Sequence, residues 1–253
     1  MPLRYFISDV HLGAATDDTP ESLLAFFDHA ASQNAELYIL GDLFDYWMEY
    51  PNAVPDLHRP VLEALQSYCA AVSPIHLITG NHDNWTRGYF EELGCRVTGE
   101  AIELNEPAPT LLLHGDGLAD ADYGLPRPAT HRLLRHPAFV SLYQRLFPLR
   151  SGLAIMKWVS GVNRNLGKTD PSRLSEWARE YVKASHFHYI ITGHDHVPRV
   201  ETFAHGIHIN CGAFYLHRTL CRYTNSRFEL VTWDAATSAL SPVKGTNAVN
   251  YTP

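Results

Sequence analysis

The stretch HLITGNHDNW, residues 76–85, joins a short apolar run to a cluster of polar side chains. The apolar residues predict a buried strand, and Gly80 turns the chain before Asn81, His82 and Asp83. An ordinary turn uses Asn and Asp because both tolerate a left-handed backbone. It gives no reason for an imidazole between them, whereas a metal site uses such side chains as ligands and proton carriers. The rest of the chain decides between the two interpretations.

Four other apolar runs end in the same way. RYFIS, LYIL, TLLLH and YIITG each predict a buried strand, and each is followed by aspartate or histidine. In open α/β sheets, ligand sites form beyond the carboxyl ends of the strands. We therefore expect the side chains after the five strands to meet. They are Asp9, His11, Asp42, Asp45, Asn81, His82, Asp83, His114, Asp116, His194, Asp195 and His196.

Helices are predicted between these strands. They begin at Thr19, as an N-cap before Pro20, near Asp56, in YFEELG before Gly94, and over residues 170–184, where Asp170 precedes Pro171. The last part of the chain, with VETF, IHIN, TLCRYT and RFELVTW, predicts an antiparallel meander. Alternating elements followed by consecutive strands predict an α/β fold with mixed sheets.

Composition narrows the class of protein. The chain has 253 residues, a net charge of −7, fifteen histidines and four cysteines without a C-x-x-C pair. Unpaired cysteines favour reduced thiols and a cytoplasmic location. No apolar run reaches the length of a membrane span, and the amino-terminal run is too short for a secretory signal. Peripheral contact with the inner membrane surface remains open, and the oligomeric state is not predicted.

Residues 123–169 differ from the rest of the chain. This segment contains eight Lys or Arg and no Asp or Glu, so it carries +8 and the remaining residues carry −15. A solvated helix face could explain basic residues alone, but a reversal this complete favours an anionic partner. We predict a core of residues 1–119 and 185–253 and a helical lid insertion of residues 120–184.

The donor types favour two metal ions. Seven nitrogen and oxygen donors exceed what one four-coordinate ion needs. Imidazole and carboxylate without thiolate favour a first-row ion, with Mn as the first choice and Fe or Zn as alternatives. Such a pair of ions stabilises both oxygens of a phosphoryl displacement. The expected ligands are Asp9, His11, Asp42, Asn81, His114, His194 and His196.

Together, D-x-H, G-D-x-x-D, G-N-H-D, a histidine before G-D, and G-H-x-H resemble the signature of the calcineurin-like metallophosphoesterases. The resemblance implies a four-layer α/β/β/α sandwich with the metals at the strand ends. It places Asp9, His11 and His196 at one ion and Asn81, His114 and His194 at the other, with Asp42 bridging. His82 would then be the general acid or charge stabiliser, and Asp83 would orient its ring.

Within that family the chain looks most like the UDP-2,3-diacylglucosamine pyrophosphohydrolases of the lipid A pathway, through YILGDLFDYW, HGDGLADADYG and the helical lid. These enzymes release UMP and a lipid monophosphate. The resemblance implies substrate contacts from Asp122, Ser160, Asn165 and Lys168. Basic residues of the lid would meet the pyrophosphate, and apolar ones such as Phe139, Leu142 and Leu146 would shelter acyl chains.

One position departs from that branch, which commonly has arginine where this chain has His82. The metal chemistry is unaffected, and a phosphodiesterase or phosphatase acting on nucleotides is the alternative function. A nucleic-acid partner is not expected, because the basic residues are not interleaved with regularly spaced aromatics. A binding protein without activity would lack ligands or the acid, and this chain has all of them.

Overall fold

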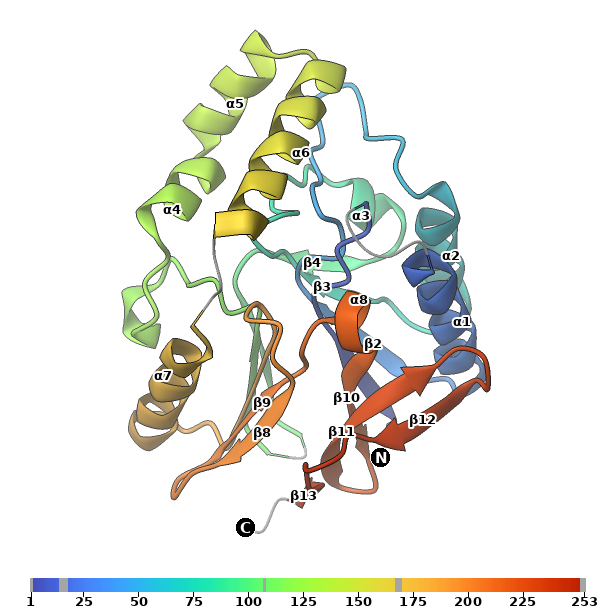
Figure 1. Ribbon diagram of the computed structural model, residues 1–253, viewed down its shortest axis with the longest axis vertical. Helices are drawn as coiled ribbons and strands as arrows, with labels where there is room; N and C mark the ends of the chain where they lie inside the picture. The colour runs from blue at the N-terminus through green and yellow to red at the C-terminus, as the bar shows by residue number, and fades with distance from the viewer. Residues whose placement is uncertain (1, 14–17, 107, 167–169, 251–253) are drawn as a thin grey trace.

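The computed structural model describes residues 2–13, 18–106, 108–166 and 170–250 (Figure 1). Two mixed β-sheets form the centre of the molecule. In the first sheet, β1 to β4 are parallel and β10 to β12 are antiparallel. Its order is β12 (Ala239–Pro242), β11 (Arg227–Asp234), β10 (Thr219–Thr224), β1 (Arg4–Ile7), β2 (Glu36–Leu40), β3 (His76–Ile78) and β4 (Arg96–Thr98), with β13 (Val249–Asn250) beside β11.

The second sheet has five strands. Its order is β5 (Ala101–Leu104), β6 (Thr110–Leu113), β7 (Tyr189–Thr192), β9 (Ile207–Asn210) and β8 (Arg199–Thr202), with β6, β7 and β9 parallel. The antiparallel meander expected for the last part of the chain is therefore wrong as a single unit. β8 and β9 join the second sheet, while β10 and β11 join the first, because β9 pairs with β7 and β10 pairs with β1.

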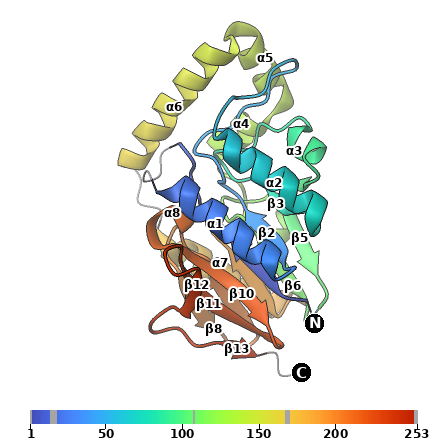
Figure 2. The same ribbon diagram turned by 90° about the vertical axis from the view of Figure 1, so that its right-hand side faces the viewer.

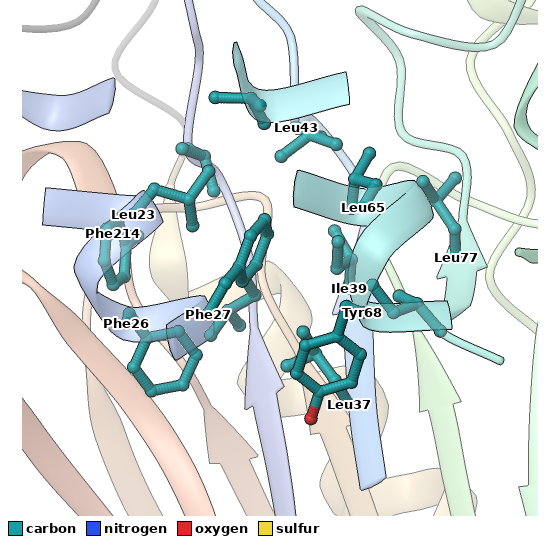
Figure 3. Close-up of a cluster of buried hydrophobic side chains, with 14 of the residues drawn as sticks. Leu23, Phe26, Phe27, Leu37, Ile39, Leu43, Leu65, Tyr68, Leu77 and Phe214 are labelled. Atoms are coloured by element: carbon teal, nitrogen blue, oxygen red, sulfur yellow. The ribbon is translucent and has the colours of Figure 1, made fainter. Parts of the chain in front are cut away.

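Helices cover the outer face of each sheet. α1 (Thr19–Ser32), α2 (Arg59–Ala71) and the short α3 (Tyr89–Glu92) lie on the first sheet, and α7 (Pro171–Ala184) lies on the second (Figures 1 and 2). Figure 3 shows Phe26 and Phe27 of α1 and Leu65 of α2 packed over Leu37 and Ile39 of β2. The predicted α/β/β/α sandwich is confirmed.

Strand burial explains this layering. Alternate residues of one strand belong to different hydrophobic clusters: in β2, Ile39 packs under the helices, whereas Tyr38 and Leu40 face the other sheet. Facing them are Leu112 of β6 and Ile191 of β7. Strands buried on both faces are expected to be apolar along their whole length, as these short runs are.

Two helix starts differ from the prediction. The residue before α1 is Asp18, so Thr19 is the first helical residue and not the cap. α2 begins at Arg59, since His58 before it is left-handed with φ of 49°. α7 follows Asp170, whose carboxylate accepts a hydrogen bond from the N–H of Ser172 as expected for an N-cap.

The segment predicted as an insertion contains the 3₁₀ turn η1 (Ala121–Tyr123) and helices α4 (Ala129–Arg135), α5 (Pro137–Leu146), α6 (Leu149–Leu166) and α7. The first three α-helices rise above the strand ends (Figure 1). Their apolar residues, Phe139, Phe147, Leu153 and Ile155 among them, pack against Met48, Trp85 and Tyr143, whereas Leu142 and Leu146 are exposed. α7 instead packs on the second sheet through Leu174, Ala178 and Val182. None of the described helices is long and apolar enough to cross a bilayer.

Candidate metal centre

The loops that follow β1, β2, β3, β6 and β7 meet at one end of the sandwich. Hydrogen bonds tie the loops together: the N–H groups of Asp9 and His11 donate to the carbonyls of Gly41 and Asp42. Three groups of side chains each bring their donor atoms within 4.8 Å of one another. They are Asp9/His11/His196, His11/Asp42/His82 and Asp9/Asp42/His114. The five strand ends that we expected to converge do converge.

One half of the centre is formed by Asp9, His11 and His196. His196 Nε2 lies 3.3 Å from Asp9 Oδ1 and 3.2 Å from His11 Nε2. His11 Nε2 in turn lies 3.8 Å from Asp9 Oδ1. These three side chains come from both sheets, since His196 follows β7 and the other two follow β1.

The other half is formed by Asn81, His114 and His194. His114 Nε2 lies 3.1 Å from Asn81 Oδ1, and its ring centre is 5.0 Å from that of His194. Asp42 stands between the halves, because its Oδ2 is 3.7 Å from His11 Nε2 and 3.4 Å from His114 Nε2. Asp42 therefore lies between an imidazole of each half, where a bridging carboxylate would be expected.

Hydrogen bonds to neighbouring groups orient the ligand side chains toward the centre. Asp9 Oδ2 accepts from the Ser8 hydroxyl at 2.6 Å and from the His194 N–H at 2.8 Å. Asp9 Oδ1 is buried without a hydrogen-bond partner among the described residues. His114 Nδ1 donates to the Leu40 carbonyl at 2.9 Å, which directs Nε2 into the centre. A buried carboxylate oxygen without a partner is costly unless it meets a cation, so these residues fit divalent metal ions.

The backbone at these residues is unusual. Five of the expected ligands have positive φ: Asp9 at 51°, His11 at 48°, Asp42 at 54°, His194 at 73° and His196 at 65°. A left-handed conformation at a residue other than glycine is disfavoured, and such strain collects at functional sites. The fold therefore holds these side chains in place at the expense of local stability.

Electrostatics keep the carboxylates ionised. Burial alone would raise the pKa of Asp42, but the adjacent His114 and His82 hold the pKa well below its usual range. Burial alone would lower the pKa of His114, but Asp42 raises it to about 10. His194 is buried beside His114, and its pKa falls to about 4. The metal-free centre is thus a set of buried, mutually compensating charges, in which bound cations would take the place of the imidazole protons.

Glycines next to the ligands allow close packing. A Cβ on Gly193 would lie 1.8 Å from Ser8 Oγ and 2.3 Å from Asp9 Oδ2, and one on Gly80 would lie 2.0 Å from Asp42 Oδ1. Each of these positions touches a ligand carboxylate or the hydroxyl that holds it. Neither site has room for a methyl group.

We predict that Gly193→Ala lowers both metal affinity and thermal stability. The added methyl must displace the Ser8 hydroxyl and the Asp9 carboxylate, and overpacking of this kind costs about 1–3 kcal/mol. Metal analysis after dialysis and a melting curve would measure the two effects. Gly245→Ala is the control for metal content: nothing lies within 4 Å of its Cβ position, and its φ of 82° confines the cost of the substitution to local backbone strain. Wild-type metal content in Gly193→Ala would contradict the prediction.

His82 and Asp83 have separate tasks. His82 Nδ1 lies 2.7 Å from the carbonyl oxygen of Asp45, and Nε2 points toward Asp42 Oδ2 at 4.0 Å. The Asp83 carboxylate accepts from the backbone N–H groups of Gly80 and Leu43, both at 2.7 Å. The orienting role predicted for Asp83 therefore needs correction: the Asp45 main chain orients the His82 ring, while Asp83 holds the loops after β2 and β3 together.

Asp45 and Asp116 also follow two of the strands but are not among the expected ligands, and their surroundings differ. Asp45 Oδ1 lies 3.4 Å from His11 Nδ1, which directs His11 Nε2 to the centre. Asp116 instead lies among basic groups, with Oδ2 3.3 Å from His131 Nδ1 and 3.4 Å from Arg135 Nη2.

Two residues next to the centre were not predicted from the sequence. Tyr215 of α8 (Phe214–His217) packs edge-on to His11 and His196, with ring centres 5.2 and 5.6 Å apart. Arg199 of β8 forms an ion pair with Asp195, the residue between His194 and His196 in the sequence, with Nη2 2.8 Å from Oδ2. Tyr215 follows a sixth strand end, β9, and position after a strand is the signal that could have found it.

The predicted substrate residues lie in the segment that we predicted to be an insertion. Asp122 is exposed in η1, and its N–H donates to the Asp120 carboxylate. Ser160 and Asn165 belong to α6, for which the structure describes the main chain but not these two side chains. Lys168 lies outside the described residues. Contact of these four residues with a substrate remains a prediction.

A four-layer sandwich with carboxylates and imidazoles gathered at its strand ends fits a metal-dependent phosphoesterase. The model of the family described as calcineurin-like phosphoesterase matches residues 4–198. The chain belongs to this family, whose members are metal-dependent hydrolases of phosphate esters.

Individual relatives are similar over most of the chain. UDP-2,3-diacylglucosamine hydrolase of Nitrosococcus oceani is 29% identical over 94% of this chain and 90% of that protein. The protein of the same name from Chromobacterium violaceum is 34% identical over 81% of this chain and 85% of that protein. A solved mutant of a cold-active protein tyrosine phosphatase is 14% identical with a TM-score of 0.50, covers 96% and 81% of the two chains, and shares the fold.

Proposed function

We propose that this protein uses two divalent ions, Mn first among them, to hydrolyse the pyrophosphate bond of UDP-2,3-diacylglucosamine or a similar lipid-linked nucleotide sugar to UMP and a lipid monophosphate. The observation that carries the dinuclear centre is the position of Asp42 Oδ2, within 3.7 Å of one imidazole nitrogen in each half. The named relatives support the substrate, since their similarity extends through the insertion.

The chain's own residues have defined tasks in this reaction. The bound ions would supply Lewis-acid stabilisation of the phosphoryl oxygens. The carbonyl of Asp45 can only accept a hydrogen bond, so Nδ1 of His82 carries a proton and Nε2 faces the centre. A second proton on Nε2 would then be placed to neutralise charge on the leaving oxygen.

The lid suits an amphiphilic substrate. Arg132, Arg145, Arg150 and Lys157 are exposed on it, and so are Leu133, Leu142, Leu146 and Trp158, the last with 69% of its surface accessible. Cationic and apolar groups on the same helices favour an anionic lipid and contact with the cytoplasmic face of a membrane.

A phosphodiesterase or phosphatase acting on nucleotides is the second candidate, and His82 favours it. One comparison separates the two functions: hydrolysis of the acylated UDP-sugar against bis-p-nitrophenyl phosphate and cyclic nucleotides, each with added Mn. We expect kcat/KM for the acylated UDP-sugar to exceed the others by at least about 10²-fold, because acyl contacts add to the phosphoryl contacts. Turnover of the model diesters without the lipid nucleotide would favour the second candidate.

A further inference from the structure

The insertion is joined to the metal centre through a buried carboxylate. Asp116 lies two residues after His114 and is only 4% exposed. Three basic groups at the start of the insertion approach its Oδ2: Arg127 Nε at 3.8 Å, His131 Nδ1 at 3.3 Å and Arg135 Nη2 at 3.4 Å. A buried carboxylate is stable only with such partners, so the loop after β6 and helix α4 are held together.

Arg135 also reaches the loop after β3. Its Nη2 donates to the carbonyl of Gly80 at 2.6 Å and to that of Thr79 at 3.3 Å, and its Nη1 donates to Thr79 Oγ1 at 3.2 Å. These are the two residues before Asn81. The planar guanidinium can bind several acceptors in fixed directions, which an ammonium cannot do.

The contacts of Arg135 are confined to one side of the centre. Among the described residues, Arg135 donates its hydrogen bonds to the loops after β3, β4 and β6. Two of these loops carry Asn81 and His114. The other half is supported elsewhere: Ser8 and the His194 N–H hold Asp9, and the Asp42 carbonyl accepts from the N–H of His11.

We propose that Arg135 is a positioning residue for one of the two ions, the one held by Asn81 and His114, and that it couples this ion to the position of the lid. The proposal rests on the dinuclear centre proposed above. Arg135 is the last residue of α4, so the same side chain that fixes the ligand loops also fixes the first helix of the insertion. Movement of α4 on substrate binding would reach Asn81 through two carbonyl groups.

The expected effect of Arg135→Ala is selective. Loss of a group that orients metal ligands lowers metal affinity by about 10- to 100-fold. We expect that loss of affinity for the Mn ion held by Asn81 and His114, with the affinity for the Mn ion of the other half unchanged. Arg135→Lys keeps a donor for the Gly80 carbonyl and should recover part of the affinity. Arg132→Ala, on an exposed position of the same helix, is the matched control and should bind both ions as the wild type does.

Calorimetric titration of the full chain with Mn, together with electron paramagnetic resonance of the coupled Mn pair, measures both affinities without any substrate. A wild-type protein that binds fewer than two ions would overturn the dinuclear centre itself. A wild-type protein with two ions, and an Arg135→Ala variant with unchanged affinities, would overturn the role of Arg135 alone. Parallel weakening of both ions in Arg135→Ala, or an equal effect in Arg132→Ala, would show a general structural effect and would also overturn it.

Discussion

Replacing Asp42 with alanine is expected to remove both ions and to lower kcat/KM by at least about 10³-fold, or roughly 4 kcal/mol of transition-state stabilisation. The carboxylate lies between the halves, 3.7 Å from His11 Nε2 and 3.4 Å from His114 Nε2. Its Oδ1 also accepts from the His82 N–H at 2.9 Å. Its removal therefore leaves the imidazoles without their shared anion and frees the loop that carries His82. Elemental analysis of the dialysed protein and steady-state kinetics would measure the two losses.

Two further variants make the Asp42 test specific. Asp42→Asn keeps the shape but not the charge, so it should retain the fold and bind metal more weakly than the wild type. Asp28→Ala removes an exposed carboxylate from the second half of α1 and should leave both quantities unchanged. Two retained ions in Asp42→Ala would show that this carboxylate does not bridge the centre.

The second large effect is expected from His82→Ala: a fall in kcat of about 10²- to 10⁴-fold with both ions retained. The fall should be larger for esters with strongly basic leaving groups than for bis-p-nitrophenyl phosphate, because a good leaving group needs little help from a proton. Kinetics on a series of leaving groups, with metal analysis of the same samples, would test this.

The metal analysis is decisive for His82, because it lies with His11 and Asp42 in one of the three donor groups. His186→Ala, which removes an exposed imidazole, is the matched control and should behave as the wild type. Loss of one ion from His82→Ala would make His82 a ligand and not an acid.

Sequence alone predicted the convergence of the strand ends, and the physical reason is local. Ligand-type residues such as Asp9 and Asn81 follow directly after apolar runs, and parallel strands place their carboxyl ends at one edge of a sheet. The four-layer order was implied by the resemblance to the calcineurin-like family, whereas the alternating elements alone predicted an α/β fold with mixed sheets. The convergence of the strand ends needs only short stretches of chain and a general rule of topology.

What the sequence did not predict depends on contacts between distant residues. The pairing of β10 with β1 splits the expected meander, and it joins residues more than 200 positions apart. Arg135 reaches Gly80 across 55 positions. The role predicted for Asp83 was wrong because its carboxylate accepts hydrogen bonds from the N–H of Gly80 in the same turn and from the N–H of Leu43, which is 40 positions away.

Each half of the centre takes donors from both sheets: Asp9 and His11 follow a strand of the first sheet and His196 one of the second, and Asn81 and His114 divide in the same way. Each bound ion would therefore cross-link the two sheets. A ligand that binds only the folded chain adds about 2.7 kcal/mol to its stability at 100 times its dissociation constant. Depletion of the metal would then lower the free energy of unfolding as well as remove the catalytic activity.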